Sequence, residues 1–151
     1  MTYPERIVPD ETEPGIVALH LKRYEFALPW CRDRDVLDAG CGVGYGSALL
    51  ATAARRVVGV DRDEDAIRYA RERYGAANVE FRVGDLLELD LPDGSFDTVC
   101  SFETIEPVRS AIAATAASRL RPRHSSASHV TSGSVAAKSI ATVFGFWPIP
   151  R

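Results

Sequence analysis

The stretch over residues 36–47, Val-Leu-Asp-Ala-Gly-Cys-Gly-Val-Gly-Tyr-Gly-Ser, limits most strongly what this chain can fold into. It begins with apolar residues suited to a buried strand, carries an acid at Asp38, and continues with glycines at alternate positions, Gly40, Gly42 and Gly44. A helix-like run over 47–54 follows at once. Strand, glycine turn and helix together predict a place where a ligand meets bare backbone at a helix N-terminus. Glycine suits that turn because a Cβ would clash with the turn or with the ligand.

The rest of the chain up to residue 102 alternates strand-like and helix-like segments. Strands are predicted at 35–39, 56–60, 79–83 and 96–102. Helices are expected over 45–54 and 63–74, the second with Asp63 as its N-cap and Gly75 as its C-cap. This alternation predicts an α/β fold with a parallel sheet and right-handed crossovers. With 151 residues, the chain is long enough for one domain with a real core.

Residues 1–34 form a predicted arm and helix ahead of the first strand. Prolines at positions 4, 9 and 14 predict an extended arm over 2–13. An amphipathic helix is predicted over 15–28, ended by Pro29, with His20 as a packing or surface residue. The acidic, proline-containing N-terminus does not resemble a signal peptide, and no apolar run reaches the roughly 18 to 20 residues of a membrane helix.

The cysteines, Cys31, Cys41 and Cys100, lie far apart and form no C-x-x-C motif. An odd, scattered set of this kind indicates reduced thiols in a cytoplasmic protein rather than disulfides or a zinc site. Each is predicted to be a small buried apolar residue. No metal site is predicted elsewhere, since His124 and His129 have no carboxylate near them in the sequence.

Acids stand at or just beyond the ends of the first three predicted strands. Asp38 lies near the tip of the first strand, Asp61 ends the second, and Asp85 follows the third behind Gly84. A carboxylate at the position of Asp61 can accept both hydroxyls of a ribose. Asp85 and the apolar Leu86 beside it suit an adenine. The carboxylate would accept a hydrogen bond from the exocyclic amine, and the leucine would pack on the ring. Because the carboxyl ends of parallel strands meet at one edge of a sheet, these acids are predicted to converge on one ligand site.

The ordered motifs resemble those of the class I S-adenosylmethionine-dependent methyltransferases over about residues 35–106. They are Asp38-Ala-Gly-Cys-Gly-Val-Gly, Val60-Asp61, Gly84-Asp85, and Phe96-Asp97 leading into Ser101-Phe102-Glu103. The sequence is most similar to the small-molecule and glycan-type branch, in which a comparable arm and helix precede the first strand. The resemblance implies a Rossmann-like sheet of strand order 3-2-1-4 with helices on both faces, and S-adenosylmethionine as the cofactor.

The resemblance also implies roles for individual residues. The glycine turn would pass close to the methionine portion of the cofactor, whose amino group Asp38 would help to hold. Asp61 would bind the ribose hydroxyls, and Asp85 the adenine. The catalytic residues stay unknown, since the reaction is displacement at a methyl carbon that a sulfonium already activates, and the enzyme mainly supplies alignment and, for some acceptors, a base. The cofactor-binding residues predicted in this way are Asp38, Gly40, Cys41, Gly42, Gly44, Asp61, Arg62, Gly84, Asp85, Leu86, Ser101 and Phe102.

A nicotinamide-binding Rossmann domain is the main alternative. Its G-x-G-x-x-G fingerprint fails in this chain, because the last position falls on Tyr45 counted from Gly40 and on Ser47 counted from Gly42. The acids Asp38 and Asp85 also fit the methyltransferase interpretation better.

Residues 107–151 differ in composition from everything before them. All 21 Asp and Glu lie at or before Glu106, so the net charge is −9 up to that residue and +6 after it. The acidic main body argues against a large nucleic-acid footprint. Where the family commonly has Gly-Gly and a fifth strand, this chain has Arg123 and His124 after a possible helix over 111–120. Two explanations stay open, a natural short domain with a flexible tail and a reading-frame disruption between about residues 106 and 123.

This atypical, poorly ordered tail would leave the sheet incomplete relative to the seven strands of the family. The fourth strand is then expected to expose an apolar edge at residues 98–100, unless the apolar segment 143–147 covers it. Two functions are predicted. One is a methyltransferase acting on a small molecule or glycan; the other is a catalytically inactive cofactor-binding fragment, because the acceptor half of the family fold is missing. No nucleic-acid or membrane partner is expected, and no oligomeric state is indicated.

Overall fold

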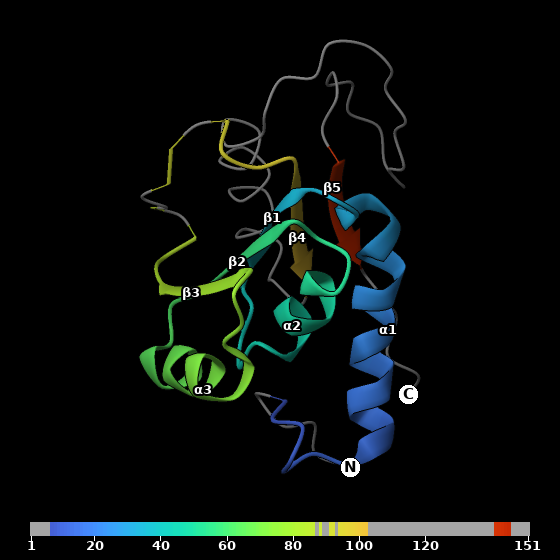
Figure 1. Cartoon of the computed structure of the whole chain (residues 1–151). Helices are drawn as coiled ribbons and strands as arrows, with labels where there is room; N and C mark the ends of the chain where they lie inside the picture. Colours follow the sequence, from blue (N-terminus) through green and yellow to red (C-terminus); the bar gives the residue numbers. More distant parts are fainter. Residues whose placement is uncertain (1–6, 87, 89–90, 93, 103–140, 146–151) are drawn as a thin grey trace.

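The structure, a computed structural model, describes residues 7–86, 88, 91–92, 94–102 and 141–145. A five-stranded sheet in the order β3-β2-β1-β4-β5 forms its centre (Figure 1). All strand pairings are parallel. This confirms the predicted α/β class and the order 3-2-1-4, and it adds a strand beside β4. The strands are β1 (Asp35–Ala39), β2 (Arg56–Asp61), β3 (Val79–Val83), β4 (Thr98–Phe102) and β5 (Ala141–Gly145).

The helices of the described part are α1 (Pro14–Cys31), α2 (Tyr45–Ala51) and α3 (Glu64–Tyr74). The predicted end of α1 at Pro29 is wrong, because the helix continues through Pro29 to Cys31. A proline this close to the end of a helix removes only one backbone donor. Ala27 and Cys31 are both fully buried, and their packing holds the last turn of α1 in helical form.

The two predicted caps of α3 have different outcomes. Asp63 caps the N-terminus as expected, since its Oδ1 accepts a hydrogen bond from the Ala66 amide at 3.0 Å. Gly75 is the C-cap residue, but its φ of −60° is not the left-handed conformation that favours glycine. The glycine is needed there for space, because a Cβ would lie 2.7 Å from the Arg71 carbonyl oxygen.

The described helices pack on one face of the sheet. On that face Val36 and Val57 lie in a core cluster with Leu50 of α2 and Tyr24 of α1, and β3 packs against α3 through Phe81. The opposite face carries a second cluster that includes Leu37, Val58 and Val99. The residues that the structure describes over this second face are Leu86, Leu91 and Phe96 of the β3–β4 connection. The possible helix over 111–120 lies outside the described residues, so helices on both faces stay a prediction.

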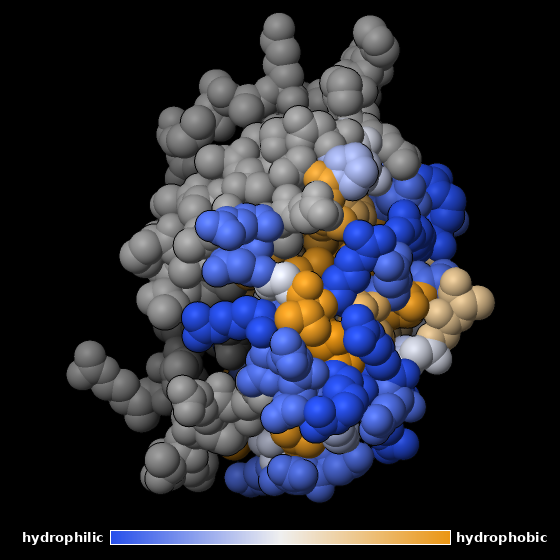
Figure 2. Space-filling model, turned by 90° about the vertical axis from the view of Figure 1, so that its left-hand side faces the viewer, coloured by the Kyte–Doolittle hydropathy of each residue, from blue (hydrophilic) through white to orange (hydrophobic). Residues whose placement is uncertain are grey.

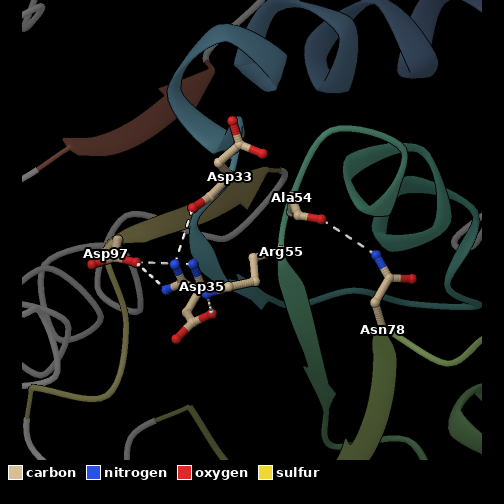
Figure 3. Close-up of polar contacts among 6 residues, drawn as sticks. All are labelled: Asp33, Asp35, Ala54, Arg55, Asn78 and Asp97. Atoms are coloured by element: carbon tan, nitrogen blue, oxygen red, sulfur yellow. Dashed lines mark hydrogen bonds and ion pairs between the residues drawn. The ribbon is translucent and has the colours of Figure 1, made fainter.

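The amino ends of β1 and β4 are joined by a charged cluster around Arg55 (Figure 3). The Arg55 guanidinium donates to Asp35 Oδ1 at 2.8 Å and to Asp97 Oδ2 at 3.1 Å. The same Asp97 oxygen accepts the backbone amide of Asp35 at 3.0 Å. Asn78 ties the start of β3 to the end of α2 through its bond to the Ala51 carbonyl. These groups lie at the opposite end of the strands from the glycine turn.

The two edges of the sheet differ. β3 is one edge, where Glu80 pairs with Arg82 and with Arg56, and charged edges of this kind resist pairing with other chains. Figure 2 shows a face on which hydrophilic side chains surround a small apolar area. At the other side β5 covers β4, with residues 98–102 opposite residues 141–145. The expected bare edge at 98–100 is therefore wrong, and the covering segment begins two residues earlier than the segment 143–147 that was considered.

The N-terminal arm is not extended throughout. The Glu11 amide donates to the Val8 carbonyl at 2.9 Å, and the Val8 amide donates to Thr12 Oγ1 at 3.2 Å, which forms a turn. Asp10 in this turn accepts a hydrogen bond from Tyr69 of α3 at 3.2 Å. No helix in the described part of the chain is long and apolar enough to span a membrane.

Candidate functional site

The predicted site lies at the carboxyl ends of β1, β2 and β3. The sheet register places Ala39 opposite Val60 and Asp61 opposite Val83. The Gly84 amide donates to the Asp61 carbonyl at 2.9 Å, so the start of the segment after β3 lies directly beside the end of β2. The parallel sheet therefore brings together the ends of the three strands that carry the predicted acids.

The glycine turn after β1 is held against the end of β2. The Val60 carbonyl accepts the amides of both Gly40 and Cys41, at 2.8 and 3.1 Å. The φ angles of Gly40, Gly42 and Gly44 are 84°, 54° and 89°, all in the left-handed region that disfavours a side chain. The conformation predicted from the alternating glycines is thus present in the backbone.

Gly42 and Gly44 have different surroundings. A Cβ at Gly44 would lie 2.7 Å from the Ala70 Cβ and 2.8 Å from the Phe81 ring, so this glycine allows the turn to pack closely against α3 and β3. A Cβ at Gly42 would meet no atom of the described residues within 4 Å. Gly42 therefore presents bare backbone to open space, as a ligand-binding turn requires.

Asp61 ties the turn to α3. Its Oδ2 accepts the Gly42 amide at 2.9 Å, and its Oδ1 accepts the Asp63 amide at 3.0 Å. A carboxylate can accept about four hydrogen bonds, two at each oxygen. Each oxygen of Asp61 therefore keeps a lone pair that a further donor can use.

Asp38 is fully buried beneath the first turn of α2. Its Oδ2 accepts a hydrogen bond from the Ser47 hydroxyl at 2.6 Å. Its Oδ1 is also buried, and no donor from the described residues reaches it. Burial and, to a smaller extent, the charge of Asp61 raise the pKa of Asp38 to about 7, although the hydrogen bond from Ser47 opposes the rise. A buried carboxylate oxygen without a donor is costly, so this atom is suited to receive a donor from a ligand.

The other predicted residues are spread around this centre. Arg62 and Asp85 are exposed, and Leu86 is half-buried against the core cluster of the second face. The Ser101 hydroxyl donates to the Ala39 carbonyl at 3.1 Å, which places it beside the end of β1. Phe102 lies in the core under α1, with its ring centroid 4.7 Å from that of Tyr24.

Three residues near Asp38 were not singled out from the sequence. They are Tyr24, Ser47 and Gly59. A Cβ at Gly59 would lie 2.9 Å from the Ser47 oxygen and 3.0 Å from the Cys41 sulfur, so this glycine makes room for both side chains. A single glycine inside a valine-rich strand is the signal that could have indicated such a close approach.

His20 and the three cysteines all lie among the described residues. His20 packs as expected, being 5% exposed and 3.5 Å from the Tyr45 hydroxyl, and burial lowers its pKa to about 4. The three cysteines are free and buried, as predicted. The sulfurs of Cys31 and Cys100 nevertheless lie 3.8 Å apart, a proximity that their spacing in the sequence did not indicate. Among the described residues, no cluster of three or more potential ligands is arranged for a metal ion.

The fold and the site together define a class of protein. A parallel sheet of order 3-2-1-4, a glycine turn after the first strand, and acids at or just beyond the carboxyl ends of the first three strands are typical of Rossmann-like domains that bind a nucleoside-containing cofactor. The methyltransferase domain family matches residues 36–123. The chain belongs to the family of class I S-adenosylmethionine-dependent methyltransferases.

Individual relatives agree with this assignment. A probable S-adenosylmethionine-dependent methyltransferase of Mycobacterium tuberculosis is 46% identical over 103 residues, which cover 68% of this chain and 37% of the relative. A fatty-acid O-methyltransferase of Mycolicibacterium smegmatis is 38% identical over 73 residues, covering 47% of this chain and 27% of the relative. The chain thus spans well under half the length of these relatives.

A solved structure shows the same fold. Phosphoethanolamine N-methyltransferase 1 of Haemonchus contortus, in complex with phosphoethanolamine and S-adenosylhomocysteine, matches with a TM-score of 0.65 and 26% identity. The match covers 73% of this chain and 25% of that one. The likeness therefore spans most of this chain and a quarter of the longer one.

Proposed function

We propose that this chain binds S-adenosylmethionine at the carboxyl ends of β1, β2 and β3 and transfers its methyl group to a small-molecule acceptor. The observation that carries the proposal is the pairing of two features. The Gly42 backbone faces open space in a left-handed conformation, and the buried Asp38 beside it keeps Oδ1 without a donor among the described residues. An acid and bare backbone in this arrangement suit the ammonium and carboxylate of an amino-acid end.

The remaining residues fit the other parts of the cofactor. The free lone pairs of Asp61 can accept the two ribose hydroxyls, and this carboxylate is already fixed by two backbone amides. Leu86 would pack on the adenine, with Asp85 accepting from its exocyclic amine and Gly84 allowing the chain to turn at the end of β3. Arg62, Ser101 and Phe102 stay predicted members of the site at its border.

The cofactor supplies a methyl carbon activated by a sulfonium, so the chain needs to supply alignment rather than a strong nucleophile. Asp38 would fix the amino-acid end of the cofactor, and Asp61 would fix its ribose. Gly42 in the turn between them presents bare backbone to open space.

A small-molecule acceptor is supported by the relatives, whose names include a fatty-acid and a phosphoethanolamine methyltransferase. A glycan acceptor and a cytoplasmic location stay predictions. The second candidate is a cofactor-binding protein without turnover, because the described residues that support the proposal all serve cofactor binding and none of them is assigned to the acceptor.

Isotopically labelled S-adenosylmethionine separates the two candidates. Incubation of the purified chain with a panel of fatty acids, amino alcohols and sugars should yield labelled product above the level of a boiled control. If folded protein binds S-adenosylhomocysteine but no acceptor gains label, the binding function without turnover is the correct one.

A further inference from the structure

The contact between Ser47 and Asp38 is built into several elements. Ser47 is the third residue of α2 and is completely buried, although serine is ordinarily a surface residue. Its hydroxyl lies 2.6 Å from Asp38 Oδ2, a distance typical of a hydrogen bond to a charged carboxylate. Burial of polar groups costs stability unless their hydrogen bonds are satisfied, so a buried pair of this kind indicates a role in the site.

The neighbouring backbone is shaped to admit this pair. Gly59 stands opposite Asp38 in the sheet register, and any side chain there would displace the Ser47 hydroxyl. Gly46 of α2 makes room for a side chain of α1 in the same way, since a Cβ at this position would lie 2.0 Å from the Tyr24 ring. Two glycines on two elements thus keep space around one carboxylate.

In the part of the chain that the structure describes, the groups that act on the charge of Asp38 are hydroxyls, thiols and a second carboxylate. The Ser47 hydroxyl contacts Asp38 directly, and the groups that influence it through their charge or polarity are the hydroxyls of Tyr24 and Tyr45, the thiols of Cys41 and Cys100, and the carboxylate of Asp61. Among the described residues, none of the groups that act on its charge is an arginine, lysine or histidine. A buried carboxylate is expensive without a positive partner, so the site is complete only when a ligand brings one.

We propose that Ser47 is a positioning residue for cofactor binding, whose hydroxyl holds the Asp38 carboxylate ionised and fixes Oδ2, so that Oδ1 is left to the ammonium group of the ligand. This inference rests on the proposed function, because the ammonium group belongs to the amino-acid end of S-adenosylmethionine.

The proton balance of Asp38 makes the role of Ser47 measurable. Burial has raised the pKa of this carboxyl to about 7, and the hydrogen bond from Ser47 opposes the rise. Removal of the hydroxyl therefore raises the pKa further. At a pH below that pKa the carboxyl is protonated and loses its attraction for an ammonium group. At such a pH, each further unit by which the pKa of Asp38 rises weakens binding of the ammonium group about tenfold.

Calorimetric titration with S-adenosylhomocysteine from about pH 5.5 to about pH 9 tests the inference. The unsubstituted chain should bind more tightly as the pH rises through about 7. Ser47→Ala should bind about tenfold more weakly near neutral pH and recover most of the loss at the alkaline end. Ser47→Thr, which keeps the hydroxyl, should follow the unsubstituted chain. The ammonium group of the ligand titrates alike with all three proteins, so the difference between them belongs to the protein.

Methylthioadenosine, which has the nucleoside but lacks the amino-acid end, is the matched ligand control. Its affinity should be the same for Ser47→Ala and the unsubstituted chain at every pH. A loss in Ser47→Ala that is equal at all pH values, or equal for both ligands, would show a merely structural role and overturn the inference. Failure of the unsubstituted chain to bind S-adenosylhomocysteine at any pH would instead overturn the proposed function, and the inference with it.

Discussion

At the scale of single residues, the glycines of the turn serve two separate purposes. Gly44 faces Ala70 and Phe81 at distances too short for any side chain, whereas Gly42 faces open space. Both have left-handed φ angles. The alternating glycines predicted a turn with bare backbone, but the sequence does not distinguish a glycine required by packing from one available to a ligand.

Substitution of the two glycines should separate stability from binding. Gly42→Ala should lower the free energy of unfolding by only about 1–2 kcal/mol, the cost of a left-handed side chain. Gly44→Ala adds an overpacking cost and should lower it by about 2–5 kcal/mol. Gly42→Ala should also weaken S-adenosylhomocysteine binding about tenfold or more, equal to about 1.4 kcal/mol.

Urea denaturation and calorimetry check these values on the same preparations. A Gly42→Ala protein that binds as tightly as the unsubstituted chain would show that the open face of the turn is not where the ligand lies.

At the scale of elements, each end of the parallel strands has its own polar system. The carboxyl ends carry Asp38 and Asp61, which keep oxygen lone pairs for further donors. The amino ends carry Asp35 and Asp97, whose carboxylates are mostly buried and are bridged by Arg55. This difference separates candidate ligand-binding acids from structural ones, although all four are aspartates at strand ends in the sequence.

Loss of Arg55 should therefore affect stability and leave ligand binding unchanged. Arg55→Ala leaves Asp35 and Asp97 close together without their shared cation, so the midpoint of urea unfolding should fall. Arg55→Lys should restore part of it, because a lysine cannot reach both carboxylates with a planar fork. Arg68→Ala, which removes an exposed ion pair on α3, is the matched control and should have little effect.

The affinity of Arg55→Ala for S-adenosylhomocysteine, measured on folded protein, should match that of the unsubstituted chain. A loss of affinity comparable to that of the site variants would mean that the two ends of the sheet are coupled.

At the scale of the whole molecule, the sequence predicted the central α/β arrangement well because each strand from β1 to β4 follows a local pattern of apolar residues and turns. Contacts between distant segments were not predictable in the same way. The pairing of β5 with β4 joins segments about forty residues apart, and the continuation of α1 through Pro29 depends on burial of Cys31. The role of Ser47 depends on space left by Gly59, a residue on another element.

The contribution of β5 can be measured by truncation. A chain ending at residue 140 lacks β5 and leaves the edge of β4 unpaired, so it should unfold at lower urea concentration and self-associate more. A chain ending at residue 145 keeps β5 and is the matched control. Light scattering and urea denaturation compare the two. Equal stability and equal molecular mass would show that β5 does not protect the sheet.

The central claim is that the site at the carboxyl ends of β1 to β3 holds S-adenosylmethionine, and calorimetry with S-adenosylhomocysteine tests it most directly. The unsubstituted chain should bind one molecule, and Asp61→Ala should weaken binding by about 1–3 kcal/mol because a charged acceptor is lost. Asp65→Ala, on the exposed side of α3, is the control and should bind normally. Absence of binding by the folded, unsubstituted chain, or equal affinity in Asp61→Ala, would contradict the claim.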